Sequence, residues 1–251
     1  MGTDYILETR NLVKEFKGFI AVSDVNLRVR QGTIHGLIGP NGAGKTTVFN
    51  LLTRFLHPTR GSIIFKGSDI TRLGTAEIAR LGLVRSFQIS AVFPHLTVLE
   101  NVRIGLQRQF NSGFRFWQSE TSLKSLDGRA RELLEQVGLE SSAHAIAVEL
   151  PYGRKRTLEI ATTLALDPEM LLLDEPTQGL GLEDVERVKD LIRNVAAKRT
   201  VLMVEHNMSV VSGLCHSITV LQRGSVLAEG SYAEVSNNPH VLEAYLGVSH
   251  A

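Results

Sequence analysis

Residues 39–46 read Gly-Pro-Asn-Gly-Ala-Gly-Lys-Thr and fit the pattern G-x-x-x-x-G-K-[ST] of phosphate-binding loops. Residues 34–38 predict a short buried strand before the loop, and the residues from Lys45 onward predict a helix after it. The glycines allow backbone N–H groups to face phosphate oxygens, and the helix start adds the positive end of its dipole. The pattern therefore predicts a nucleoside-triphosphate site, with Lys45 on the β- and γ-phosphates and the Thr46 hydroxyl on Mg²⁺. The alternative is a glycine-rich turn with a chance lysine.

The composition is that of an ordinary globular protein, since 43% of the 251 residues are hydrophobic and 21% are charged. The formal net charge of +1 argues against a general nucleic-acid-binding surface. A single cysteine, Cys215, excludes an internal disulfide and fits a reducing compartment. Because no apolar run approaches the ~18 residues of a membrane span and no signal peptide is visible, we expect a cytoplasmic protein. Any membrane role would come through a partner.

Predicted strands and helices alternate along the chain. Strands are expected at 5–7, 25–29, 34–38, 63–65, 84–88, 170–174, 200–204, 217–221 and 226–229. Helices are expected at 96–106, 129–137, 154–166, 183–197 and 239–246. Thr97 and Glu100 have the spacing of a capping box at the start of the first of these helices. The alternation predicts an α/β protein with a mostly parallel sheet.

Two groups of aromatic residues are open to two interpretations each. Phe16 and Phe19 precede the loop and are either core residues, which the general behaviour of aromatics favours, or a platform for an adenine ring. Residues 108–128 lose all periodicity, which predicts an inserted surface loop. Its aromatics form either an interface with a membrane partner or a lid over a local cluster, and they are Phe110, Phe114, Phe116 and Trp117.

Polar residues follow three of the predicted buried strands. They are Gln88, the pair Asp174 and Glu175, and His206. Because open α/β sheets bind ligands at the carboxyl edge of their strands, we expect these side chains to lie near the loop. There Asp174 would reach Mg²⁺ and Glu175 would accept a proton from the attacking water. His206 would hydrogen-bond the γ-phosphate, and Gln88 would reach Mg²⁺ or the water. The alternatives are a strand-ending turn and a structural histidine.

The order of these motifs resembles that of the ATP-binding subunits of ATP-binding cassette (ABC) transporters over nearly the whole chain. It runs through the phosphate loop, Gln88, Leu-Pro-Tyr-Gly-Arg at 150–154, Leu-Leu-Leu-Asp-Glu-Pro at 171–176 and Val-Glu-His at 204–206. Other features are similar to the branched-chain amino-acid importer branch: Tyr-Gly at 152–153, Pro-Thr-Gln-Gly-Leu at 176–180, Val-Glu-His-Asn-Met at 204–208 and Ala-Tyr-Leu-Gly at 244–247.

The resemblance implies a P-loop NTPase fold of the ABC ATPase type in a single domain, 1–251. A mostly parallel core and an antiparallel β subdomain would occupy about 1–87 and 151–235, a helical subdomain about 88–150, and a short helix about 238–247. It implies an ATPase that pairs head to tail with a second ATPase subunit, identical or different. ATP binding would close the pair and ATP hydrolysis would reopen it. This cycle would drive alternating access in the transmembrane permease subunits, to which the ATPase pair binds at the cytoplasmic face of the membrane. An extracytoplasmic binding protein would be an indirect partner, and nucleic acid no partner.

Residue by residue, the resemblance implies catalytic roles for Glu175, His206 and Gln88, and Mg²⁺ contacts from Thr46, Gln88 and Asp174. It favours Phe16 as the aromatic that stacks on adenine. The remaining ATP contacts that it implies are Gly39, Asn41, Gly42, Ala43, Gly44, Lys45, Thr46 and Thr47. The signature segment, which would face the nucleotide of the partner subunit, is Pro151, Tyr152, Gly153 and Arg154.

This chain departs from the family pattern at two places. Where the family has Leu-Ser-Gly-Gly-Gln, Pro151 removes a serine hydroxyl and a backbone N–H, while Arg154 adds a cation that would compensate. Residues 178–182 lack the usual aspartate of the dimer-contact loop. We therefore hypothesise that the subunit pairs with a different ATPase and that its signature serves the weaker of two unequal sites.

Three other functions stay open at this point. An ATPase of lipopolysaccharide export shares many motifs but usually keeps Leu-Ser-Gly-Gly, which Pro151 and Tyr152 contradict. A soluble ABC protein acting on ribosomes or nucleic acid typically has two ATPase domains and basic linkers. A binding module without hydrolysis is disfavoured by the intact Lys45, Glu175 and His206. The transported substrate is not encoded in a subunit of this kind.

Overall fold

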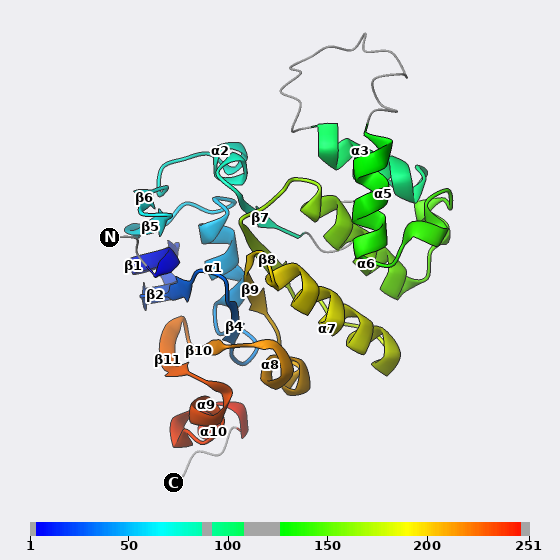
Figure 1. The fold of residues 1–251 in the computed structure, drawn as a ribbon. Helices are drawn as coiled ribbons and strands as arrows, with labels where there is room; N and C mark the ends of the chain where they lie inside the picture. Colours follow the sequence, from blue (N-terminus) through cyan, green and yellow to red (C-terminus); the bar gives the residue numbers. More distant parts are fainter. Residues whose placement is uncertain (1–3, 87–91, 108–125, 247–251) are drawn as a thin grey trace.

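The computed structural model describes residues 4–86, 92–107 and 126–246, and their strands form two sheets (Figure 1). The core sheet has the order β11-β10-β4-β9-β8-β7. Its strands are β4 (Ile34–Ile38), β7 (Leu83–Arg85), β8 (Met170–Asp174), β9 (Thr200–Val204), β10 (Ser217–Gln222) and β11 (Ser225–Gly230). Neighbours from β10 to β7 pair in parallel, and β11 pairs with β10 in antiparallel orientation. The predicted mostly parallel sheet is therefore present.

The core sheet is covered on both faces, which explains why β4, β8 and β9 are mostly apolar and are buried along their whole length. Side chains alternate between the faces of a strand. In β8, Leu171 and Leu173 pack into the cluster that includes α6 and α7, and Met170 and Leu172 pack into the cluster that includes α1 and the antiparallel sheet. The covering helices are α1 (Lys45–Leu52), α6 (Tyr152–Leu164), α7 (Leu182–Ala196) and α8 (Met208–Leu214).

The second sheet is antiparallel, as the resemblance implied, but its strands have other bounds than those predicted. Its order is β2-β1-β5-β6, with β3 also paired to β1, and its strands are β1 (Tyr5–Phe16), β2 (Phe19–Val25), β3 (Arg28–Arg30), β5 (Arg60–Phe65) and β6 (Ser68–Asp69). The expected strand at 5–7 extends to Phe16 because β1 pairs with β2, β3 and β5 in turn. The expected strand at 25–29 is two strands, since the side chain of Asn26 bonds the backbone of Asn11 and Asp24 at the break.

The hairpin between β1 and β2 contradicts a core position for Phe16 and Phe19. The two residues pair across a two-residue turn, Lys17-Gly18, in which both φ angles are positive (47° and 89°). This is the geometry of a tight type I′ hairpin. It leaves Phe16 40% and Phe19 70% exposed at the tip.

The helical part of the molecule consists of α3 (Val98–Gln107), α5 (Asp127–Gln136) and the first half of α6, which pack on one another (Figure 1). The predicted capping box begins α3: Thr97 N–H donates to Glu100 Oε2 (2.7 Å) and Glu100 N–H to Thr97 Oγ1 (3.2 Å). The helix expected at 154–166 begins earlier, at Tyr152, because Pro151 supplies a non-helical N-cap with φ −54° and ψ 153°.

Short helices complete the described part of the chain. They are α2 (Thr75–Arg80), α9 (Tyr232–Ser236), α10 (Pro239–Leu246) and the 3₁₀ turns Glu140–Ser142 and Ala147–Glu149. In the part of the chain that the structure describes, no helix has the length and apolar character needed to cross a membrane. The aromatic residues of the predicted surface loop, Phe110, Phe114, Phe116 and Trp117, lie outside the described residues.

Candidate functional site

The phosphate loop joins β4 to α1, and two of its glycines are required by close backbone neighbours. Gly39 has a φ of 149°, and a Cβ there would lie 2.2 Å from the carbonyl oxygen of Leu221. Gly44 has a φ of 100°, and a Cβ there would lie 2.7 Å from the carbonyl oxygen of Ala21. Gly42 also has a positive φ, 78°, but a Cβ there would meet no atom within 4 Å beyond its chain neighbours. The loop is thus pressed between the end of β10 and strand β2.

We expect Gly39→Ala to destabilise the protein clearly more than Gly42→Ala. At Gly42 the cost is the left-handed strain of an L-residue, about 1–2 kcal/mol, whereas at Gly39 the overlap with a backbone carbonyl adds to the strain. Thermal unfolding without nucleotide measures the difference. Equal losses in the two variants would contradict the packing of the loop against β10.

Lys45 is the first residue of α1 and points back over the loop. Its Nζ donates to the carbonyl oxygens of Gly39 (2.7 Å) and Pro40 (3.0 Å). Burial lowers the pKa of this ammonium, and the nearby charges of Glu175 and Asp174 oppose that shift. The loop lysine and both predicted carboxylates therefore share one site.

The other predicted loop residues differ in their exposure. Asn41, Gly42 and Thr46 are exposed at the surface of the loop, and Thr47 is half-buried. Ala43 is buried and anchors the loop, because its carbonyl oxygen accepts the Gly224 N–H at 3.0 Å.

The carboxyl edge of the core sheet brings Glu175 and His206 together. Asp174 is the buried last residue of β8, and Glu175 follows it with a φ of 47° while its N–H donates to the Val204 carbonyl at 2.9 Å. His206 follows β9, and its Nδ1 lies 3.7 Å from Glu175 Oε1. Both side chains are partly exposed, as groups that meet a substrate must be. Gln88 lies outside the described residues.

Sequence reasoning missed Arg85, which holds Asp174. From the end of β7, its Nη2 lies 2.5 Å from Asp174 Oδ2, and its Nη1 donates to Asn50 Oδ1 at 2.6 Å. Both partners of the ion pair are nearly buried, with side-chain exposures of 11% and 6%. The available signal was an arginine inside the strand predicted at 84–88.

Glu205 was missed as well, although it stands beside His206. It is completely buried and accepts the backbone N–H groups of His206 (2.9 Å), Asn207 (3.1 Å) and Thr177 (3.1 Å), besides the Thr177 hydroxyl. The carboxylate thereby ties the segment after β9 to the segment after β8. Its role is to fix the two loops that carry His206 and Glu175.

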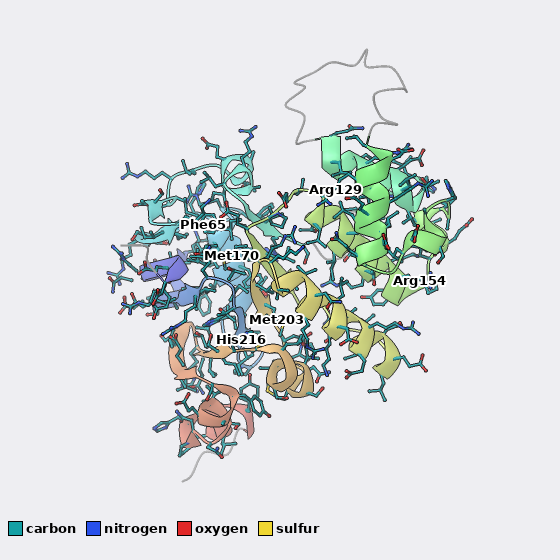
Figure 2. The ribbon with its side chains drawn as sticks, in the orientation of Figure 1. Phe65, Arg129, Arg154, Met170, Met203 and His216 are labelled. Atoms are coloured by element: carbon teal, nitrogen blue, oxygen red, sulfur yellow. The ribbon has the colours of Figure 1, made fainter. Side chains whose placement is uncertain are left out.

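The signature segment lies at the start of α6 in the helical part of the molecule, apart from the chain's own phosphate loop (Figures 1 and 2). Tyr152 directs its hydroxyl at the Gln178 carbonyl (3.5 Å). A Cβ on Gly153 would lie 2.5 Å from an oxygen of Asp184 on α7. Arg154 donates from Nη1 to Ser142 Oγ at 2.6 Å. Phe16 lies on a different element, the β1–β2 hairpin, with Lys14 Nζ 4.9 Å from its ring centre.

The donor set at the edge fits Mg²⁺ carried by a nucleotide. Thr46 and Asp174 offer a hydroxyl and a carboxylate, which are hard oxygen ligands. Among the described residues there is no cluster of three or more His, Cys, Asp or Glu side chains that would cage a metal by itself. Mg²⁺ commonly keeps its waters and binds through one or two protein groups plus substrate phosphates, so these two donors are sufficient.

Comparison with known families gives two matches. The family described as ABC transporter matches residues 22–178. The family described as branched-chain amino acid ATP-binding cassette transporter matches residues 225–251. The second match covers the edge strand β11 of the core sheet and the two short helices after it, α9 and α10.

Relatives align along nearly the full chain. The high-affinity branched-chain amino acid transport ATP-binding protein LivG of Salmonella typhimurium is 41% identical, over 96% of this chain and 98% of LivG. The lipopolysaccharide export system ATP-binding protein LptB of Acidithiobacillus ferridurans is 34% identical, over 96% of this chain and 97% of LptB.

Solved structures agree with the fold. A nucleotide-free ATP-binding cassette from an ABC transporter superposes with a TM-score of 0.86 at 30% identity, covering 97% of this chain and all of that one. A dimeric post-hydrolysis cassette bound to ADP and Pi, MJ0796, superposes with a TM-score of 0.76 at 27% identity, covering 90% and 98%. These matches confirm the predicted fold class and the predicted resemblance to the branched-chain branch. The chain belongs to the ABC transporter family, as an ATP-binding subunit whose ATPase activity energises transport.

Proposed function

We propose that this protein energises an importer of branched-chain amino acids or related small polar substrates. The observation that carries the ATPase part is the meeting of the phosphate loop, Asp174, Glu175 and His206 at one edge of the core sheet. The substrate class rests on the names of relatives such as LivG and on the family match at the C-terminal end.

The residues at this edge divide the hydrolytic step among them. Lys45 and the loop N–H groups bind the β- and γ-phosphates. Thr46 and Asp174 would hold Mg²⁺, which would neutralise charge on those phosphates. Glu175 accepts a proton from the water whose oxygen attacks the γ-phosphorus, while the bond from that phosphorus to the ADP oxygen breaks. His206 hydrogen-bonds a γ-phosphate oxygen. ADP and inorganic phosphate leave.

A second ATPase subunit completes each site. The signature segment stands on the helical part of the molecule, apart from its own loop, so a nucleotide on the loop meets the signature of another subunit. The post-hydrolysis cassette to which this chain is similar is a dimer. Pro151 offers neither a hydroxyl nor an N–H at the start of α6, and Arg154 is engaged by Ser142. The subunit therefore pairs with a different ATPase, and its signature serves the weaker of two unequal sites in the heterodimer.

The permease subunit docks in a groove between the core sheet and the helical part. This groove has a volume of about 500 Å³ and is lined mainly by apolar side chains, among them Ile78 of α2, Ile104 of α3 and Phe93 in the segment before α3. Phe93 is 51% exposed, and a short amphipathic helix would cover it. Docking there places the subunit at the cytoplasmic face of the membrane and sets the permease against the helix that carries the signature.

The test is reconstitution in proteoliposomes with permease subunits, a binding protein and a candidate partner ATPase. The purified subunit alone should hydrolyse ATP weakly. Adding the partner ATPase should raise the rate of ATP hydrolysis, and the complete proteoliposomes should take up leucine. Phe93→Glu should keep the mixed ATPase rate in solution and lose both the stimulation by permease and the uptake.

Strong ATPase activity of the subunit alone, with a sigmoidal dependence on ATP concentration, would contradict the proposed heterodimer. It would favour the ATPase of a homodimeric exporter instead. Hydrolysis that never couples to uptake of any branched-chain amino acid would overturn the substrate class.

A further inference from the structure

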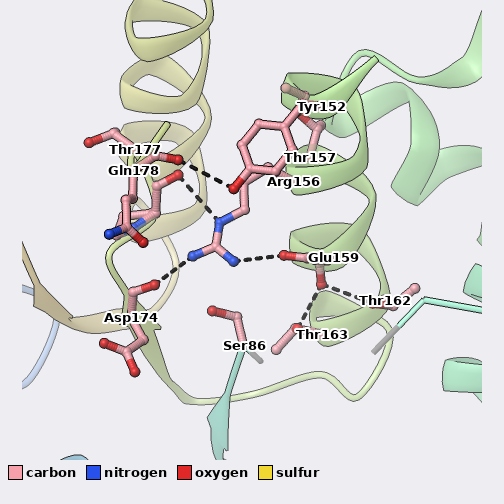
Figure 3. Close-up of polar contacts among 12 residues, drawn as sticks. Ser86, Tyr152, Arg156, Thr157, Glu159, Thr162, Thr163, Asp174, Thr177 and Gln178 are labelled. Carbon is pink, nitrogen blue, oxygen red and sulfur yellow. Dashed lines mark hydrogen bonds and ion pairs between the residues drawn. The ribbon is translucent and has the colours of Figure 1, made fainter. Parts of the chain in front are cut away.

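A buried arginine on the signature helix contacts the backbone on both sides of the general base. Arg156 lies one turn after Gly153 on α6, and its side chain is 7% exposed. Its Nη2 donates to the Asp174 carbonyl at 2.6 Å, and its Nε to the Pro176 carbonyl at 3.3 Å (Figure 3). The guanidinium thus bridges the residues before and after Glu175.

The backbone that Arg156 holds is strained. Glu175 has a φ of 47°, in the left-handed region that residues with a Cβ rarely adopt. Such a conformation persists only where the surroundings determine it more than once. The Glu175 N–H donates to the Val204 carbonyl at 2.9 Å, and the Glu175 carbonyl accepts the Gln178 N–H at 3.1 Å. Arg156 adds an anchor on each neighbouring residue, at the carbonyls of Asp174 and Pro176. The planar fork of a guanidinium suits this task, because its donors have a preset geometry.

Glu159 in turn fixes the guanidinium. Its Oε2 accepts from Arg156 Nη1 at 2.7 Å, three residues along the same helix, and its side chain is 3% exposed. A buried ion pair is weak evidence for a stabilising role, because an apolar pair of similar volume often stabilises a fold as well. The pair has a different consequence here, since it orients donors at the carbonyls of residues 174 and 176.

We propose that Arg156 is a positioning residue for Glu175, and that it transmits the position of the signature helix to the general base. The inference rests on the proposed roles of Glu175 and of the signature segment. A second link between the same two segments supports it: the Tyr152 hydroxyl reaches the Gln178 carbonyl, and its ring packs over Gly179. A movement of α6 by a partner's nucleotide therefore reaches the loop that carries the base.

The decisive variant is the double substitution Arg156→Met with Glu159→Met, which removes the fork without leaving a buried carboxylate unpaired. We expect a melting temperature close to that of the wild type and unchanged binding of a fluorescent ATP analogue. The kcat should fall between about 10-fold and 100-fold with little change in KM, since displacement of a catalytic group by about 1 Å costs that much. Arg156→Lys keeps the charge but not the fork, so it should restore only part of the kcat.

A matched control removes an ion pair elsewhere on the helical part. Arg103 and Asp127 join α3 to α5 at 2.5 Å and do not contact the base. The double substitution Arg103→Met with Asp127→Met should lower stability slightly and leave kcat unchanged. A wild-type kcat in the Arg156 double variant would overturn the proposal, as would an equal loss of kcat in the Arg103 control.

Hydrogen exchange separates this inference from the proposed function. The amides of residues 174, 175, 177 and 178 should exchange faster in the Arg156 double variant than in the wild type, whether or not the subunit hydrolyses ATP. An inactive wild type with this local change would remove the proposed function and leave the positioning role. Unchanged exchange at 174–178 would overturn the positioning role even if the subunit is an active ATPase.

Discussion

Glu175→Gln should bind ATP with the affinity of the wild type and hydrolyse it at least about 100-fold more slowly. The amide keeps the shape of the carboxylate but cannot accept the proton of the attacking water. The geometry supports this assignment, because Glu175 is partly exposed at the loop edge while Asp174 is buried against Arg85. Single-turnover hydrolysis of radiolabelled ATP, beside equilibrium binding, measures the two effects separately.

A second carboxylate next to β8 provides the control for Glu175. Glu169 precedes β8 at the opposite, amino end and pairs with Lys66 at the surface. Glu169→Gln should therefore leave both binding and hydrolysis unchanged. Full hydrolysis in Glu175→Gln would mean that another group accepts the proton. A loss of ATP binding would mean that the carboxylate acts in holding the nucleotide.

Arg85→Met should destabilise the nucleotide-free protein by about 3 kcal/mol, because it leaves the Asp174 carboxylate buried without a partner. Adding Asp174→Leu should recover most of this loss, since no uncompensated charge then remains. Urea unfolding in the presence of EDTA measures both free energies. Mg²⁺ with ATP should stabilise Arg85→Met more than it stabilises the wild type, because the cation replaces the missing guanidinium beside Asp174.

The surface pair of Lys66 and Glu169 is the matched control for Arg85. Its side chains are 45% and 50% exposed, so water screens the attraction. Lys66→Met should change stability by less than about 1 kcal/mol. Comparable losses in Lys66→Met and Arg85→Met would contradict the buried character of the pair at Asp174.

Local sequence signals were sufficient for the core sheet and for much of the site. The strands β4, β8 and β9 are continuous apolar runs because helices or sheets cover both their faces, and such runs are visible in the sequence. The polar residue that ends each run marks the carboxyl edge, which is why Glu175 and His206 were predicted and lie together. The capping box at Thr97 is local in the same sense, because its partners are three residues apart.

The sequence predicted the wrong strand bounds in the antiparallel sheet and left the exposure of two aromatics undecided, for a physical reason. Strand β1 pairs with three other strands, and its length depends on where those partners lie. Phe16 and Phe19 are exposed because a turn of two residues places both at a hairpin tip. An aromatic residue carries no local mark of whether the surrounding chain will cover it.

The sequence by itself determined the phosphate loop and the positions of Glu175, the proposed base, and His206, because each lies within a short motif attached to a predicted strand. Only the tertiary structure decided what holds them. Arg85 reaches Asp174 across 89 positions and Thr177 reaches Glu205 across 28, and Arg156 meets the backbone around Glu175 from another helix. The sequence alone does not distinguish a buried arginine or glutamate from one that is exposed to solvent. Its partners are chosen when distant segments pack, and no spacing along the chain records that choice.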